Sequence, residues 1–176
     1  MIVYFLRHAS AGKKMLNPKK DERRPLDEEG ILQTRYIGRM LAALDLQIDH
    51  IVSSPLKRAT QTASLVANEL AFERPIKTHN ALRPVASHED FLELLAHFRK
   101  SEAIIVVGHN PTMAEFLGKT ITGKAGTSQL DFKKGAVAKV DVNGRAGTLE
   151  WMVTPRIARA LQTTLKTSSR PKTARK

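Results

Sequence analysis

Short apolar runs alternate with segments of helical spacing along most of this chain. The runs that predict strands span Ile2–Leu6, His50–Ser53 and Ala103–Val107, and a weaker strand is expected at Pro75–Thr78. Short apolar runs bounded by turn residues are typical of strands that are buried on both faces. Because the segments between them have helical spacing, the pattern predicts strand–helix units that follow one another in series.

Four segments repeat apolar residues every three or four positions, which predicts helices with one buried face. These apolar positions are Leu32, Tyr36, Ile37, Met40, Leu41 and Leu44, then Ala59, Ala63, Val66 and Leu70, then Phe91, Leu94, Leu95 and Phe98, and last Met113, Phe116, Leu117 and Ile121. Acidic residues 27–29 precede the first of these helices, where the helix dipole favours negative charge. The segment from Arg7 to Arg24 shows neither pattern and is expected to form a loop.

The last two apolar runs predict a hairpin. Ala136–Val142 and Thr148–Val153 flank Asn143-Gly144, a pair that favours a tight turn between antiparallel strands. Parallel strands joined by helices require helices on both faces of the sheet. The sequence therefore predicts a three-layer α/β fold, with a mostly parallel sheet and an antiparallel hairpin at one edge.

The bulk composition fits one globular domain. The chain has 176 residues, 41% of them hydrophobic and 26% charged, a size that buries a core without disulfides or a structural metal. Cysteine is absent, which excludes thiolate chemistry and fits a reducing compartment. No apolar segment approaches the roughly 20 residues that span a bilayer, and the first apolar run is too short for a signal peptide. We therefore expect a cytoplasmic protein with no membrane partner.

Positive charge is concentrated near the C-terminus. The formal net charge is +12, and residues 156–176 contain seven basic residues and no acidic one, so residues 1–155 carry +5. We expect residues 1–155 to form the functional domain and residues 156–176 to form a basic tail. Ile157, Leu161 and Leu165 share a helical face, so the tail is expected to begin as a helix.

Histidine and arginine follow three of the predicted strands. Arg7 and His8 come directly after the first, Arg58 follows the second by five residues, and His109 follows the strand that ends near Gly108. Functional groups in an open parallel sheet collect beyond the C-terminal ends of the strands, so these side chains are expected to converge. Arginine grips phosphate oxygens, and a neutral imidazole is a nucleophile toward phosphorus. Since no acidic cluster accompanies them, we expect no metal and no other cofactor.

Three motifs carry a family resemblance. Leu6-Arg7-His8-Ala9, residues 53–63 (SSPLKRATQTA) and residues 107–111 (VGHNP) resemble, in order and spacing, the signatures of the histidine phosphatase superfamily. Arg24-Pro25-Leu26-Asp27 and the short chain resemble its SixA-type phosphohistidine phosphatase branch. Three matched motifs together are far more specific than any one alone. The resemblance covers residues 1–155 and implies the phosphoglycerate-mutase-like fold.

The resemblance also implies the role of each site residue. His8 is expected to be the nucleophile that carries the phosphoryl group. Arg7 and Arg58 are expected to bind the phosphate, and His109 to contact the same oxygens. Arg24 is expected at the rim of the pocket as a further phosphate ligand. The implied function is that of a metal-independent hydrolase, a phosphatase that acts most readily on phosphohistidine in proteins.

Two features depart from the family pattern. Ala9 stands where the family has glycine, so a methyl group is expected close to the phosphate. No carboxylate occurs in residues 80–84, where relatives place the acid that protonates the leaving group, and Glu89 is the nearest substitute. A missing acid handicaps alkyl phosphates most, because an alkoxide leaves poorly. This favours phosphohistidine or a phosphoanhydride as the substrate.

Other functions stay open at this level. The partner is either a phosphorylated protein or a small phosphorylated anion, such as a phosphoanhydride or another phosphorylated metabolite. A second class is a basic module that binds polyanions, but nucleic acid is disfavoured because aromatic residues make up only 5% of the chain and do not cluster with basic ones. The lysines at 13, 14, 19 and 20 border the expected pocket and would attract anions. The remaining histidines, His50, His79, His88 and His97, are expected to be structural or on the surface.

Overall fold

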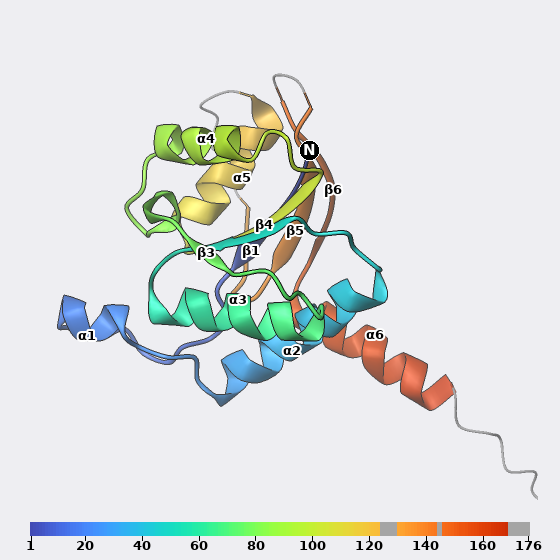
Figure 1. The fold of residues 1–176 in the computed structure, drawn as a ribbon. Helices are drawn as coiled ribbons and strands as arrows, with labels where there is room; N and C mark the ends of the chain where they lie inside the picture. Colours follow the sequence, from blue (N-terminus) through green and yellow to red (C-terminus); the bar gives the residue numbers. More distant parts are fainter. Residues whose placement is uncertain (124–129, 144–145, 169–176) are drawn as a thin grey trace, which may run out of the picture.

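The computed structural model describes residues 1–123, 130–143 and 146–168, and Figure 1 shows their arrangement. The elements in chain order are β1 (Ile2–Arg7), α1 (Pro18–Glu22), α2 (Glu28–Ala43), β2 (His50–Ser53), α3 (Lys57–Glu69), β3 (Lys77–Thr78), the 3-10 helix η1 (Asn80–Leu82), α4 (His88–His97), β4 (Ala103–Gly108), α5 (Thr112–Thr122), β5 (Val137–Asp141), β6 (Thr148–Val153) and α6 (Pro155–Ser168). The predicted strands and helices are confirmed.

The six strands form one sheet in the order β3-β2-β4-β1-β5-β6. Parallel pairing joins β3, β2, β4 and β1, whereas β5 and β6 are antiparallel, as the hairpin pattern predicted. In the register, Arg7 lies opposite Gly108 and Ser53 lies opposite Val107. The C-terminal ends of β1, β2 and β4 therefore meet at one edge of the sheet. Of the predicted turn pair at 143–144, residue 144 lies outside the described residues.

Helices cover both faces of the sheet, which confirms the three-layer prediction (Figure 1). On one face α4 and α5 pack against β1, where the rings of Phe91 and Phe116 stack at 4.6 Å and Phe91 contacts Phe5. On the other face α2, α3 and α6 enclose a second apolar cluster that includes Ile37 and Ile51. Because both faces are covered, the strand side chains between these layers are almost fully buried.

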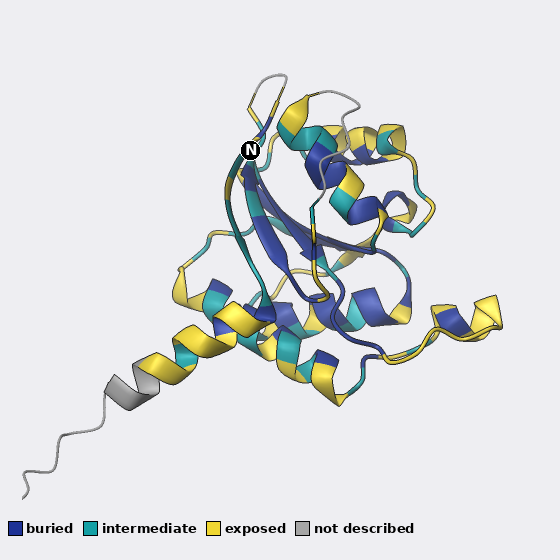
Figure 2. Cartoon of the chain, turned by 180° about the vertical axis from the view of Figure 1, so that it is seen from behind, coloured by how far each residue is buried: buried dark blue, intermediate teal, exposed yellow. Residues whose placement is uncertain are grey.

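The segment from Arg7 to Arg24 is not only the loop that was predicted, because it contains α1. Asn17 caps this helix by accepting a hydrogen bond from the backbone N–H of Lys20, and Pro18 occupies its first turn. Both are signals for a helix start that a search for apolar periodicity misses. The helix stands out from the body at the end of an extended stretch of chain (Figure 2). We call residues 11–24 the arm.

The start of the basic tail packs on the body as α6. Ala158 is fully buried, and the side-chain amide of Gln162 donates a hydrogen bond of 2.8 Å to the carbonyl of Tyr36 in α2. Beyond this contact α6 leads away from the sheet (Figure 1). Residues 169–176 of the predicted tail lie outside the described residues. Within the described ranges, no helix is both long enough and apolar enough to cross a bilayer.

Candidate active site

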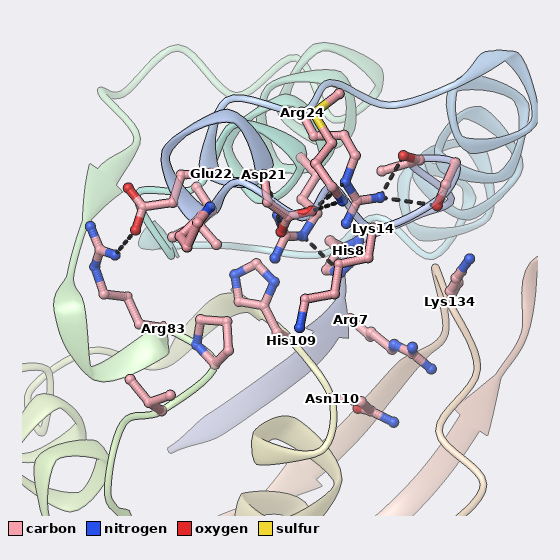
Figure 3. A pocket seen from close by; sticks show the side chains of 18 of the residues that line it. Arg7, His8, Lys14, Asp21, Glu22, Arg24, Arg83, His109, Asn110 and Lys134 are labelled. Atoms are coloured by element: carbon pink, nitrogen blue, oxygen red, sulfur yellow. Dashed lines mark hydrogen bonds and ion pairs between the residues drawn. The ribbon is translucent and has the colours of Figure 1, made fainter.

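A cavity of about 670 Å³ opens at the sheet edge where β1, β2 and β4 end (Figure 3). All five of the predicted site residues line it, namely Arg7, His8, Arg24, Arg58 and His109. The two histidines directly follow two neighbouring parallel strands, β1 and β4, and the turn after β2 leads into α3, which supplies the arginine at 58. The convergence expected from the strand-end rule is thus present in the structure.

His8 is held in one orientation by a hydrogen bond on each ring nitrogen. Its Nδ1 lies 2.7 Å from the backbone carbonyl of Ala9, a group that only accepts, so Nδ1 carries the hydrogen. Its Nε2 lies 3.3 Å from Nε of Arg58, a group that only donates. Nε2 therefore carries the lone pair, which accepts the hydrogen bond from Arg58. This is the form in which an imidazole acts as a nucleophile.

The two histidines are neighbours in a buried and positively charged setting. Their ring centroids are 4.9 Å apart. Burial lowers the pKa of His8 to about 3, with Arg58 and Arg7 acting in the same direction and the hydrogen bond to Ala9 opposing them. Burial also lowers the pKa of His109 to about 2, helped by the nearby His8 and Arg58. Both rings are therefore neutral in the resting site.

The guanidinium of Arg58 is tied to the arm through Asp21. Nη1 of Arg58 donates to the Asp21 backbone carbonyl at 3.0 Å and lies 3.3 Å from its carboxylate. The other carboxylate oxygen accepts from Nε of Arg24 at 3.0 Å. Nη1 of Arg24 donates to the carbonyls of Ala11 and Gly12. Arg24 lines the cavity as predicted, and these contacts give it a part in holding the arm in place.

Asp21 is a site residue that the sequence interpretation did not identify. Burial works to raise the pKa of its carboxyl, but hydrogen bonds from the Met15 N–H and from Arg24 outweigh this and lower the pKa. The carboxylate is thus ionised and joins two arginines. The available signal was the cap at Asn17-Pro18, which would have placed position 21 on a short helix. Its contact with Arg58 depends on tertiary packing.

Several polar atoms of the site are buried without a partner in the described part of the chain. They are Nε of Arg7, Nδ1 of His109 and Oδ1 of Asn110. The other end of each side chain is anchored: Nη1 of Arg7 and Nδ2 of Asn110 both donate to the carbonyl of Phe132, and Nε2 of His109 lies 2.8 Å from Oγ of Ser54. Buried polar groups that lack partners are costly, so the site is suited to a ligand that supplies an acceptor for Nε of Arg7, while Oδ1 of Asn110 would need a donor.

The outer lining of the cavity adds further charge. Lys14, Arg83 and Lys134 line it, and in Figure 3 the side chain of Lys14 reaches across the cavity. Of the lysines that were expected to border the pocket, those at 13, 19 and 20 are not among its lining residues. The lining carboxylates are Asp21 and Glu22, and Glu89 is not one of them.

Two further expectations concern Ala9 and metal binding. The side chain of Ala9 is fully buried in a small apolar cluster with Ala11 and Leu26, and it does not line the cavity. Its methyl group is therefore not part of the cavity wall.

Among the described residues there is no group of three histidine or acidic side chains arranged to hold a metal ion.

Comparison with known proteins identifies relatives. Residues 3–89 match the model of the histidine phosphatase superfamily (branch 1). An uncharacterised protein of Picosynechococcus sp. is 30% identical over 78% of this chain and 82% of its own. The phosphohistidine phosphatase SixA of Escherichia coli is 26% identical over 88% of this chain and 94% of its own. A solved structure of the protein histidine phosphatase SixA with tungstate superposes with a TM-score of 0.77, at 23% identity, over 89% of this chain and 98% of the other.

The first prediction concerns the protonation state of His8. Because its pKa is lowered to about 3, the ring should stay neutral with hydrogen on Nδ1 from pH 8 down to pH 5. Nitrogen-15 NMR of the histidine rings should show Nε2 of His8 as an unprotonated nitrogen across this range, and the signal should be absent in His8→Gln. A titration of His8 with a midpoint near 6.5, the value of a free imidazole, would contradict the assignment.

The second prediction concerns Asp21. Asp21→Asn removes the negative charge between Arg24 and Arg58, and it should lower the free energy of unfolding by about 1–3 kcal/mol. Tungstate or phosphate should raise the free energy of unfolding more in Asp21→Asn than in the wild type, because the anion takes over the pairing of Arg58. Asp49→Asn is the matched control, since Asp49 pairs with Arg74 near the N-terminal ends of β2 and β4. Equal anion effects in both variants, measured by thermal unfolding, would show that Asp21 does not support the anion site.

Proposed function

The chain belongs to the histidine phosphatase superfamily and is a phosphatase, and from this premise we propose that it hydrolyses phosphohistidine in proteins through a covalent phosphoryl group on His8. The observation that carries the proposal is the fixed orientation of His8, with its Nδ1 hydrogen on the Ala9 carbonyl and its Nε2 lone pair beside Arg58. A nucleophile held in its reactive tautomer needs no base to activate it.

In the first step Nε2 of His8 attacks the phosphorus atom. A P–N bond to Nε2 forms as the P–N bond to the substrate histidine breaks, and the electron pair of that bond leaves on the substrate ring. The positive charge that develops on His8 is shared with its Nδ1–H, whose hydrogen bond to the Ala9 carbonyl then strengthens. Arg58 moves its hydrogen bond from Nε2 to a phosphoryl oxygen, and Arg7 stabilises the same charge.

In the second step water attacks the phosphorus atom of phosphorylated His8. The P–N bond breaks, its electron pair returns to Nε2, and inorganic phosphate leaves with both hydrogens of the water. We assign His109 the role of donor to a phosphoryl oxygen. In this assignment the hydroxyl of Ser54 donates to Nε2 of His109 over 2.8 Å, and Nδ1 of His109, which has no partner among the described residues, carries the hydrogen that a phosphoryl oxygen accepts.

The preference for phosphohistidine follows from the carboxylates of the cavity. Asp21 is ionised and paired with two arginines, and Glu22 pairs with Arg83 at 2.8 Å. Neither is placed to protonate a leaving group, and Glu89 lies outside the lining. An imidazole leaves as a neutral molecule once its other nitrogen is protonated, so it needs no acid from the enzyme. The 26% identity with the phosphohistidine phosphatase SixA of Escherichia coli supports the same substrate class.

The remaining parts of the proposal concern organisation. We assign catalysis to residues 1–155, which contain every lining residue of the cavity, and we treat residues 156–176 as an addition that the chemistry does not use. The reaction as written needs no metal ion. We place the protein in the cytoplasm, where phosphorylated signalling proteins are available as partners.

The third prediction tests the nucleophile. His8→Ala should lower kcat by at least about 10⁴-fold, as loss of a nucleophile does in other enzymes, while leaving the fold intact. During turnover the wild type should carry phosphate that is labile in acid and stable in base, and the label should be absent from His8→Ala. His97→Ala, at an exposed position outside the cavity, is the control. An acid-stable label, or substantial activity in His8→Ala, would overturn the assignment.

The fourth prediction tests the leaving group. In buffer with a chelator, rates should fall steeply as the leaving group becomes more basic, from phosphoramidate and phosphohistidine through aryl phosphates to alkyl phosphates. Glu89→Gln and Glu22→Gln should change phosphoramidate hydrolysis little. If either variant loses the factor of about 10²–10⁴ that a general acid supplies, that residue is the acid and phosphomonoesters become substrates. Inhibition by the chelator, reversed by Mg²⁺ or Zn²⁺, would show a metal-assisted reaction instead.

A further inference from the structure

Two apolar side chains at the cavity are far more exposed than others of their kind. Eight large apolar residues are exposed in the described part of the chain. Six of them have an exposed fraction of 43–54%, whereas the exposed fraction is 104% for Leu16 and 91% for Val85. Both of these residues line the cavity. The two largest apolar exposures in the described chain therefore occur at the site where the substrate enters.

Neither side chain is explained by the stability of the fold. Leu16 directly precedes the cap residue Asn17, a position from which an apolar side chain often packs on the fourth residue of the helix. Here that fourth residue is Asp21, which is ionised and paired, so this packing is not available. Val85 follows Pro84 and points into solvent, whereas its neighbour Ala86 packs on the core.

The two side chains come from separate walls of the cavity that are joined by an ion pair. Leu16 belongs to the arm and Val85 to the segment after η1, and Glu22 of the arm pairs with Arg83 of that segment (Figure 3). Lys14 and Lys134 line the same cavity, and neither is within ion-pair distance of a carboxylate of the described residues, although Lys134 is near enough to Asp27 to help lower the pKa of that carboxyl. The entrance thus combines two exposed apolar side chains with two cations. We call Leu16, Val85, Lys14 and Lys134 the rim.

We propose that the rim is a docking surface for a segment of a phosphorylated protein in which apolar and acidic residues flank the phosphohistidine. The proposal rests on the proposed function and adds to it what the substrate must carry beside its phosphoryl group. Leu16 and Val85 contact the apolar residues of the segment, and Lys14 and Lys134 attract its acidic residues. Burial of the exposed apolar surface contributes binding free energy, and the matched charges contribute specificity.

The charge at the entrance selects this occupant over others. A second copy of the chain would bring the same cations to the same entrance, and each copy carries a net charge of +12. A small phosphorylated metabolite occupies the region of His8 and leaves the rim uncovered. A protein segment alone reaches the phosphate site and both walls of the entrance at once.

The fifth prediction is tested with two synthetic peptides that each contain one histidine, phosphorylated with potassium phosphoramidate. In one the histidine is flanked by leucine and glutamate, and in the other by serine and glycine. The wild type should hydrolyse the first with a kcat/KM about tenfold or more above the second, a ratio expected to fall at high salt. In Leu16→Ser and in Val85→Ser this ratio of kcat/KM values should fall about tenfold and approach one.

Small-substrate activity separates docking from chemistry. Hydrolysis of phosphoramidate itself should stay within about twofold of wild type in both variants, the size expected for surface substitutions. Leu92→Ser is the matched control, because Leu92 is 50% exposed on α4 and does not line the cavity. It should leave the peptide ratio unchanged.

Three results would overturn the docking surface. They are an equal kcat/KM for both peptides in the wild type, an equal loss on peptide and phosphoramidate in the variants, and a dimer of the wild type in analytical ultracentrifugation that Leu16→Ser dissociates. Failure of the proposed function itself has a different signature, since the wild type would then hydrolyse neither phosphoramidate nor either peptide.

Discussion

Arg58 donates a hydrogen bond to Nε2 of His8, and the geometry of the whole site follows from this contact. Only an unprotonated Nε2 can accept this hydrogen bond, and the buried charge of the guanidinium also disfavours a second proton on the His8 ring. The arginine is placed by Asp21, and Asp21 is placed by Arg24 and by the N–H of Met15. A series of polar contacts therefore connects His8 to the arm.

The sheet places this series next to a second group of polar contacts. Because β1 and β4 are parallel neighbours in register, His8 and His109 emerge side by side at the same edge. Arg7 leaves the end of the same strand and is anchored on the Phe132 carbonyl. Burial removes water from these groups and leaves some of their N–H atoms without acceptors. A phosphoryl group has both the acceptors and the negative charge that these groups match, which is why the proposed reaction places it here.

The arm carries both the contacts that hold Arg58 and an exposed apolar side chain at the cavity. Its inner side carries Asp21 and Arg24, which hold Arg58, and its outer side carries Leu16. The ion pair between Glu22 and Arg83 then links the arm to the wall that carries Val85. Under the proposed function, a protein segment that covers the rim would lie over the side chains that position His8.

The sequence by itself determined the order of strands and helices apart from α1 and η1, the layers of the fold, and the convergence of His8, Arg58 and His109. These features depend on local apolar periodicity and on the rule that parallel strands end at one edge, and both can be derived from the chain without coordinates. Tertiary structure alone decided the tautomer of His8, the role of Asp21 and the exposure of Leu16 and Val85. Each depends on a contact, or on the lack of one, between residues distant in sequence: Asp21 meets Arg58 across 37 positions, and Arg58 meets His8 across 50. Local patterns carry no information about such contacts, because these become favourable only when packing has removed the groups from water.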